Sequence, residues 1–250
     1  MKKDNISQTA KRIFNISKVL TIEQWKEPTA LIWTTLSPSA LFILLLTSRE
    51  TTTLVTHDYI ASASWFYAYI SSSVAMFGLS LYLIGRRESG FVRSFIYQRQ
   101  SLTLFLTSHL LSYSFTGLIH FTTFYLITRP LYGAYAMDEY LHLIACAYIS
   151  YLYFSCAGLA ISLLPIKFTT ANTLFSIISF AMLSLGYMGA TYVNSSVSGL
   201  KSSNPLVLST KIFLGEIPLA HSASIAFALL SICIFFTHRY FRIQPIWSRY

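Results

Sequence analysis

Long runs of uncharged, apolar residues constrain this chain more than any other feature. Only 11% of its 250 residues are charged and 54% are hydrophobic, whereas roughly 25% of residues are charged in an ordinary soluble domain. A helix needs about 20 predominantly apolar residues to cross the hydrocarbon core of a bilayer. Six runs are close to this length or exceed it: Pro28–Thr47, Ala61–Gly85, Leu102–Thr128, Tyr140–Leu164, Thr169–Val193 and Ile217–Thr237. The sequence therefore predicts an all-α membrane protein with six transmembrane helices.

The distribution of Lys and Arg predicts how these spans are oriented. With six spans, 14 of the 18 basic residues fall on the side that holds both termini, and four fall on the other side. Because cytoplasmic loops carry the excess of Lys and Arg, both termini are expected in the cytoplasm. The net charge of +9 is therefore explained by membrane topology, and no nucleic-acid partner is expected.

Three segments outside the spans have patterns of their own. Residues 1–27 place Ile13, Ile16 and Leu20 at helical spacing among basic residues, which predicts an amphipathic helix at the membrane surface, with a disordered basic tail as the alternative. The six-span domain is expected over residues 28–237, and a basic cytoplasmic tail over 238–250. The segment from Arg86 to Ser101 can form an amphipathic helix with Phe91, Phe95 and Ile96 on one side. The long connection before the sixth span is expected to be partly helical.

The chain lacks the common signatures of catalysis and energy conversion. It contains no phosphate loop G-x-x-x-x-G-K-[ST], no H-E-x-x-H and no G-x-S-x-G. Its three cysteines, Cys146, Cys156 and Cys233, lie in apolar runs and are interpreted as small buried hydrophobes. The spans also carry almost no ionisable residues at mid-depth, which argues against a proton-coupled secondary transporter.

Histidines and aromatic residues of the spans are the remaining candidates for binding. His109 and His120 are eleven residues apart on the third span, which places them on one helix face about 16 Å apart along the axis. Hydrogen bonding between helices is one interpretation of these histidines, and ligation of b-type haem is the alternative. The aromatic side chains Tyr67, Tyr113, Phe121 and Tyr151 could line a path for an amphipathic substrate, or they could simply pack.

Three features, in chain order, carry a resemblance to a known family. An amphipathic segment precedes Glu27-Pro28 and the first span. The second span ends in Gly85-Arg86-Arg87-Glu88-Ser89-Gly90, and the last external loop carries Asn204-Pro205 and continues to Gly215. In this order the features resemble the membrane permease subunit of type-2 ABC exporters: the second is similar to the R-E-x-G entry to that family's cytoplasmic coupling helix, and the third to its re-entrant external helices. The resemblance covers essentially the whole chain.

The resemblance implies a half-transporter in the bacterial inner membrane. A second permease subunit, identical or related, would complete the path, and two copies of a separate ABC ATPase would bind ATP and Mg²⁺, so this chain would hold no cofactor and catalyse no reaction. The segment from Glu88 to Gln98 would be the coupling helix, and the residues expected to meet the ATPase are Arg86, Arg87, Glu88, Ser89, Gly90, Phe91, Arg93 and Phe95. A membrane protein that transports nothing, such as an immunity or assembly factor, is the alternative.

Overall fold

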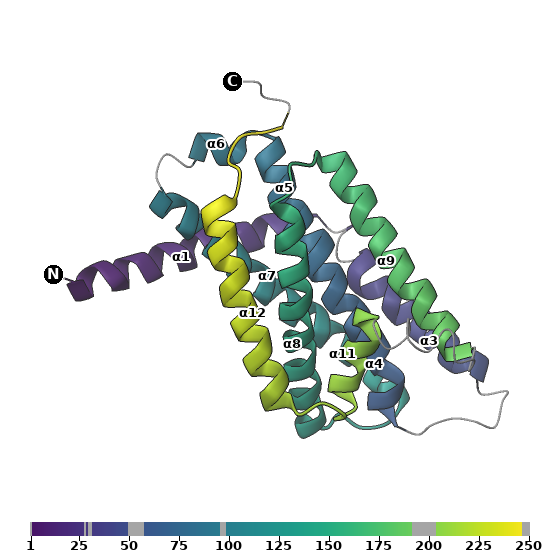
Figure 1. Ribbon diagram of the computed structural model, residues 1–250. Coiled ribbons are helices and arrows are strands. Elements are labelled where there is room, and N and C mark those ends of the chain that lie inside the picture. Colours follow the sequence, from purple (N-terminus) through teal and green to yellow (C-terminus); the bar gives the residue numbers. More distant parts are fainter. Residues whose placement is uncertain are drawn as a thin grey trace.

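The computed structural model describes residues 2–27, 29, 32–49, 58–95, 99–191 and 204–246. Every element in these ranges is a helix (Figure 1). In chain order they are α1 (Lys2–Trp25), η1 (Ile32–Leu36), α3 (Ser37–Arg49), α4 (Tyr59–Ser73), η2 (Val74–Ser80), α5 (Leu81–Glu88), α6 (Phe91–Phe95), α7 (Arg99–Thr128), η3 (Arg129–Leu131), α8 (Met137–Ser162), α9 (Phe168–Thr191), α11 (Pro205–Phe213) and α12 (Leu219–Tyr240).

Five of the helical stretches are long and apolar enough to cross a membrane. They cover Tyr59–Glu88, Ser101–Leu131, Met137–Ser162, Phe168–Gly186 and Leu219–Tyr240, so the prediction of an all-α, multi-pass membrane protein is confirmed. The first apolar run forms a shorter helix over Ile32–Thr47. Pro28, where the first span was expected to begin, lies outside the described residues, as does Val193 at the expected end of the fifth.

The stretch formed by α4, η2 and α5 is the centre of the bundle. Tyr67, Ile70, Leu83 and Ile84 of this stretch are completely buried, and α7 and α8 pack along it. Helices α9 and α12 lie at the outside of the bundle (Figure 1). They leave large apolar side chains such as Phe180 (71% exposed) and Phe235 (65% exposed) uncovered, as a surface that faces lipid requires.

One end of the bundle is filled by aromatic rings. Phe42 of α3 contacts the rings of Tyr59, Phe66 and Phe124 at centroid distances of 5.2–6.2 Å, and the Tyr59 hydroxyl shares a hydrogen bond with Thr128 (2.7 Å). Edge-to-face packing of this kind is favourable and leaves little space between helices. It joins the first apolar helix to the core at the end that lies away from α6.

The α8 helix approaches the central stretch closely at Gly158. A Cβ atom at this position would lie 2.1 Å from the Ser80 hydroxyl oxygen and 3.3 Å from the Ala75 carbonyl oxygen. The Ser80 hydroxyl donates a hydrogen bond to that same carbonyl (3.0 Å). Small residues permit such close contact between membrane helices. In lipid, dispersion and hydrogen bonds drive helix association, because the hydrophobic effect does not act between helices there.

We expect Gly158→Val to destabilise the protein by about 1–3 kcal/mol, because the added side chain must displace Ser80 or separate the two helices. Ala160→Val is the matched control, since Ala160 is exposed on the same helix. Thermal unfolding of the purified protein in one detergent measures both. Equal melting temperatures for the two variants would contradict the close approach.

Candidate functional site

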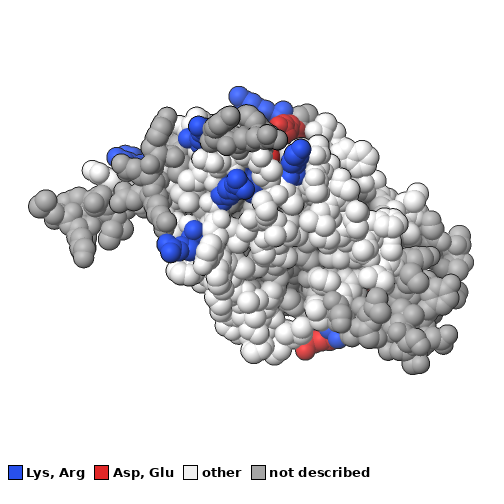
Figure 2. All heavy atoms as spheres, turned by 45° about the horizontal axis from the view of Figure 1, so that its top comes forward, with Lys and Arg blue, Asp and Glu red and all other residues white. Residues whose placement is uncertain are grey.

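Basic side chains gather at the end of the bundle that carries α6, which we call the basic end. Figure 2 shows Lys and Arg side chains on the face that is uppermost in Figure 1. The elements at this end contribute Arg86, Arg87, Arg93, Lys167, Arg239 and Arg242. The acidic residues Asp58, Asp138, Glu139 and Glu216 belong to the starts of α4 and α8 and to the loop after α11, at the opposite end.

Arg87 is the largest completely buried side chain of the described residues. Its guanidinium donates hydrogen bonds to the carbonyl oxygens of Ser162 (2.9 Å), Leu164 (3.2 Å) and Ile166 (2.6 Å). These carbonyls belong to the end of α8 and to the turn that leads into α9. The last carbonyls of a helix have no partner within the helix, and a basic side chain near this terminus also interacts favourably with its dipole. Arg87 thereby ties α5 to the turn between α8 and α9.

Glu88 extends this connection to the C-terminal segment. One of its carboxylate oxygens accepts a hydrogen bond from Nε of Arg87 (3.1 Å), and both carboxylate oxygens face the backbone N–H of Ile246 at 3.3 and 3.4 Å. Phe241 and Pro245 of the same segment are buried. The residues after α12 therefore fold back across the basic end, as the yellow trace in Figure 1 shows.

Arg86 makes the corresponding connection to α1. Its guanidinium forms an ion pair with Glu23 of α1 and donates a hydrogen bond to the Tyr82 hydroxyl. It also lies over the rings of Tyr82 (4.7 Å) and Phe91 (4.6 Å), an arrangement that stabilises a cation through the electron density of the ring face. Consecutive residues at the end of α5 thus bind three different parts of the chain.

The segment after α5 differs from the continuous amphipathic helix that the sequence predicted. The backbone N–H groups of Ser89 and Gly90 close the end of α5, and Gly90 has a positive φ of 77°, which turns the chain and separates α5 from α6. Val92, which the prediction did not single out, is completely buried, whereas Phe91 is 36% exposed. Arg93 is exposed on α6. The side chain of Phe95 and residues 96–98, including the predicted end at Gln98, lie outside what the structure describes.

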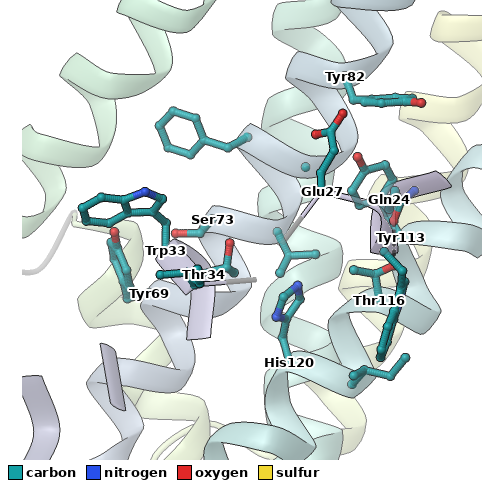
Figure 3. A pocket seen from close by; sticks show the side chains of 16 residues that line it. Gln24, Glu27, Trp33, Thr34, Tyr69, Ser73, Tyr82, Tyr113, Thr116 and His120 are labelled. Atoms are coloured by element: carbon teal, nitrogen blue, oxygen red, sulfur yellow. Dashed lines mark hydrogen bonds between the residues drawn. The ribbon is translucent and has the colours of Figure 1, made fainter. Parts of the chain in front are cut away.

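A cavity of about 540 Å³ lies between α1, η1, η2 and α7. Figure 3 shows Trp33 and Tyr69 on one side of it, Gln24, Tyr113 and Thr116 on the other, and Glu27 between them. Glu27, which we expected only to mark the start of the first span, is the one described lining residue with a formal charge. The lining is otherwise aromatic, hydroxylic or aliphatic: Gln24, Trp25, Ile32, Trp33, Thr34, Tyr69, Ser73, Val74, Phe77, Gly78, Tyr82, Tyr113, Thr116, Ile119 and His120.

The predicted substrate path is only partly brought together at this cavity. Tyr113 lines it, but Tyr67, Phe121 and Tyr151 do not. Those three side chains are completely buried; the Tyr67 ring, for example, packs against Phe124 and Phe213 at centroid distances of 4.9 and 5.8 Å. These three side chains take part in packing in this structure, because neighbouring helices enclose their rings.

Two π-helical segments border the cavity. The segment η1 contributes Ile32, Trp33 and Thr34, and η2 contributes Val74, Phe77 and Gly78. A Cβ atom at Gly78 would lie 2.6 Å from the Tyr113 ring. The absence of a side chain at Gly78 therefore allows the Tyr113 ring, which lines the cavity, to approach the backbone of η2. π-Helical turns are rare and occur frequently at functional sites. Sequence reasoning did not predict either π-helical segment, and neither contains a proline.

The histidines take part in packing and hydrogen bonding. His109 lies between the rings of Tyr82 and Phe105, with centroids 5.3 and 5.7 Å away, and its Nε2 is 3.1 Å from the Leu79 carbonyl oxygen. His120 shares a hydrogen bond with Thr35 through Nδ1. Because aromatic rings stack on His109 in this way, the geometry gives no support to its interpretation as a haem ligand.

The segment before the last apolar helix contains α11, whose start is capped by a side chain. Asn204 is the N-cap of α11: its side-chain oxygen accepts a hydrogen bond from the Leu206 N–H (3.0 Å), and its Nδ2 donates to the Met182 carbonyl of α9 (2.8 Å). Pro205 occupies the first helical turn, where its missing N–H has no cost. Gly215 has φ of 74° after the helix ends. Residues 192–203 lie outside the described part of the chain.

We expect Arg87→Met to destabilise the basic end by about 2–3 kcal/mol, because it removes the guanidinium donors of the Ser162 and Ile166 carbonyls and leaves the Leu164 carbonyl with the Ile166 N–H alone. Trypsin should then cleave more rapidly after Lys167, at the start of α9. Arg239→Met is the control, since Arg239 is exposed at the end of α12. Unchanged cleavage after Lys167 in Arg87→Met would contradict the capping role.

Comparison with known proteins yields one relative of nearly equal length. Protein McbE of Escherichia coli is 27% identical to this chain over 236 residues, which cover 92% of this chain and 96% of McbE. No family model matches the chain, and no solved structure matches it.

Proposed function

We propose that this chain is the membrane-spanning permease half of an ATP-driven exporter of the type-2 ABC class. Two permease chains, identical or related, form the translocation path. Two separate ATPase chains dock at the basic end, and these chains bind ATP and Mg²⁺. The substrate is an amphipathic molecule. The observation that carries the proposal is the set of contacts made by Arg86, Arg87 and Glu88, which join the end of α5, just before α6, to three other parts of the chain.

These contacts suit a short helix that receives force from a partner. A displacement of α6 is transmitted through Arg86 to α1, through Arg87 to the turn between α8 and α9, and through Glu88 to the C-terminal segment. A loop that served only to place positive charge in the cytoplasm would need none of these contacts. The buried guanidinium and its three carbonyl acceptors therefore distinguish this segment from a solvated basic loop, and in the proposal they make it a rigid attachment for a helix that a partner moves.

The proposal includes the topology and location of the chain. Six spans cross the bacterial inner membrane, the first of them from Pro28 to Thr47, and both termini lie in the cytoplasm. The basic end is cytoplasmic because it holds the excess of Arg and Lys. Helix α1 lies at the inner surface, where exposed apolar side chains such as Phe14 (56%) and Trp25 (52%) contact lipid. The region of Asn204, Pro205 and Gly215 forms the re-entrant external segment.

The first test is recovery of an ATPase with the tagged chain, purified from its own cells in a mild detergent and identified by mass spectrometry. Arg93→Glu reverses a charge on the exposed side of α6. We expect it to reduce recovery of a phosphate-loop ATPase at least about tenfold, because charge reversal at an interface costs several kcal/mol. Arg239→Glu makes the same reversal at the basic end, outside α6.

The control variant should retain the ATPase at the level of the parent chain. Loss of the ATPase in Arg93→Glu alone would locate its docking site on α6. A parent chain that is recovered alone, in a detergent that preserves a known permease–ATPase complex, would overturn the exporter proposal in favour of a membrane protein without an ATPase partner.

A further inference from the structure

The cavity beside α1 has a size, a charge and a lining that together indicate which kind of ligand it binds. Its volume of about 540 Å³ lies within the range of roughly 300–1,000 Å³ that is typical of small-molecule sites. Both of its π-helical borders, η1 and η2, depart from regular helix at this place. The side chains of Trp33 (71% exposed) and Trp25 (52% exposed) remain accessible at its edge, so a molecule can enter from the side of the bundle.

The charge of the residues that line the cavity indicates the charge of the ligand that fits it. Glu27 is the one formally charged residue among the described residues that line the cavity. Arg86, which lies over Tyr82 at the edge of the site, is already paired with Glu23. His120 is engaged with Thr35. Glu27, whose side chain is exposed just after the end of α1, therefore presents the one formal charge among the described lining residues, and a positively charged group would complement it.

The aromatic walls select the kind of cation. The side chains of Trp25, Trp33, Tyr69, Phe77, Tyr82 and Tyr113 line the same cavity as Glu27. Ring faces attract cations, most strongly when the cation is weakly hydrated, and cages of several aromatic rings recognise quaternary ammonium groups. Small inorganic ions are poorly matched, because only one carboxylate is present and they keep their hydration water more strongly. A large aromatic cation gains from both the carboxylate and the walls.

We propose that this cavity is a binding site for a singly charged organic cation with an aromatic body, which enters from the membrane and is held by Glu27 and the surrounding rings. Binding requires this chain alone. That the bound cation is also exported rests on the proposed function.

Ethidium, a planar aromatic monocation, is the probe. Its binding to the purified chain in detergent is measured by fluorescence polarisation, without any ATPase. Glu27→Gln keeps the shape of the side chain and removes its charge; we expect about tenfold weaker binding, which is the change produced by losing one charge-assisted contact. Glu216→Gln is the matched control, because Glu216 is an exposed carboxylate in the loop after α11.

A second pair of variants tests the aromatic wall, and decides the question if Glu27→Gln does not yield folded protein. Trp33→Leu is expected to weaken ethidium binding about threefold or more through the lost ring face. Phe180→Leu removes an aromatic ring of the same 71% exposure on α9, outside the cavity, and should bind as the parent does. Equal binding by the parent, Glu27→Gln and Trp33→Leu would overturn the site, and so would equal losses in the control variants.

The two proposals fail separately. Recovery of the chain without an ATPase would overturn the exporter and leave a Glu27-dependent cation site standing. Recovery with an ATPase, but ethidium binding that does not depend on Glu27 or Trp33, would overturn the cation site and leave the exporter standing.

Discussion

A guanidinium group cannot be removed from water without hydrogen-bond acceptors, and at Arg87 these are the Glu88 carboxylate and three backbone carbonyls, at the end of α8 and in the turn that follows it. An unpaired buried charge would cost several kcal/mol. The end of α8 needs donors for the same reason, because its last carbonyls have no partners within the helix. Each requirement is satisfied by the other, so the position of α5 fixes the turn between α8 and α9. The C-terminal segment and α6 are then arranged around Glu88 and Gly90.

The part of the fold that could be predicted from the sequence depends on the contrast between apolar and polar residues. Five of the six predicted apolar runs correspond to long helices, and those of their predicted ends that fall in the described residues differ by a few residues. The connection before the sixth span was expected to be partly helical, and α11 begins there at Asn204-Pro205, where an amide N-cap followed by proline satisfies the first turn of a helix locally. Such features depend on neighbouring residues, which the sequence displays directly.

The candidate site was less predictable, because in a membrane protein both the core and the lipid-facing surface are apolar. Hydrophobic periodicity therefore does not separate Tyr67, Phe121 and Tyr151, which are enclosed, from Trp33, which is exposed at the cavity. The break at Gly90 was hidden for a related reason, since a glycine can continue a helix or end it according to its tertiary surroundings. Glu27 was visible only as the residue before Pro28, because its cavity is formed by η2 and α7, which are distant in the sequence.

The basic end and the cavity share structural members, which gives the two proposals a physical connection. Tyr82 lines the cavity and also accepts the hydrogen bond from Arg86. Gln24 lines it as well, and its side chain bridges α1 to Ser112 and Thr116 of α7 at 2.9 and 2.6 Å. Glu23, which pairs with Arg86, is four residues before Glu27 on the same part of the chain. A movement of α6 that displaces Arg86 would therefore act on Tyr82 and on the end of α1, and both border the cavity that Glu27 lines. In an exporter, this is the geometry by which ATP binding at one surface would weaken the hold on a cation in the membrane.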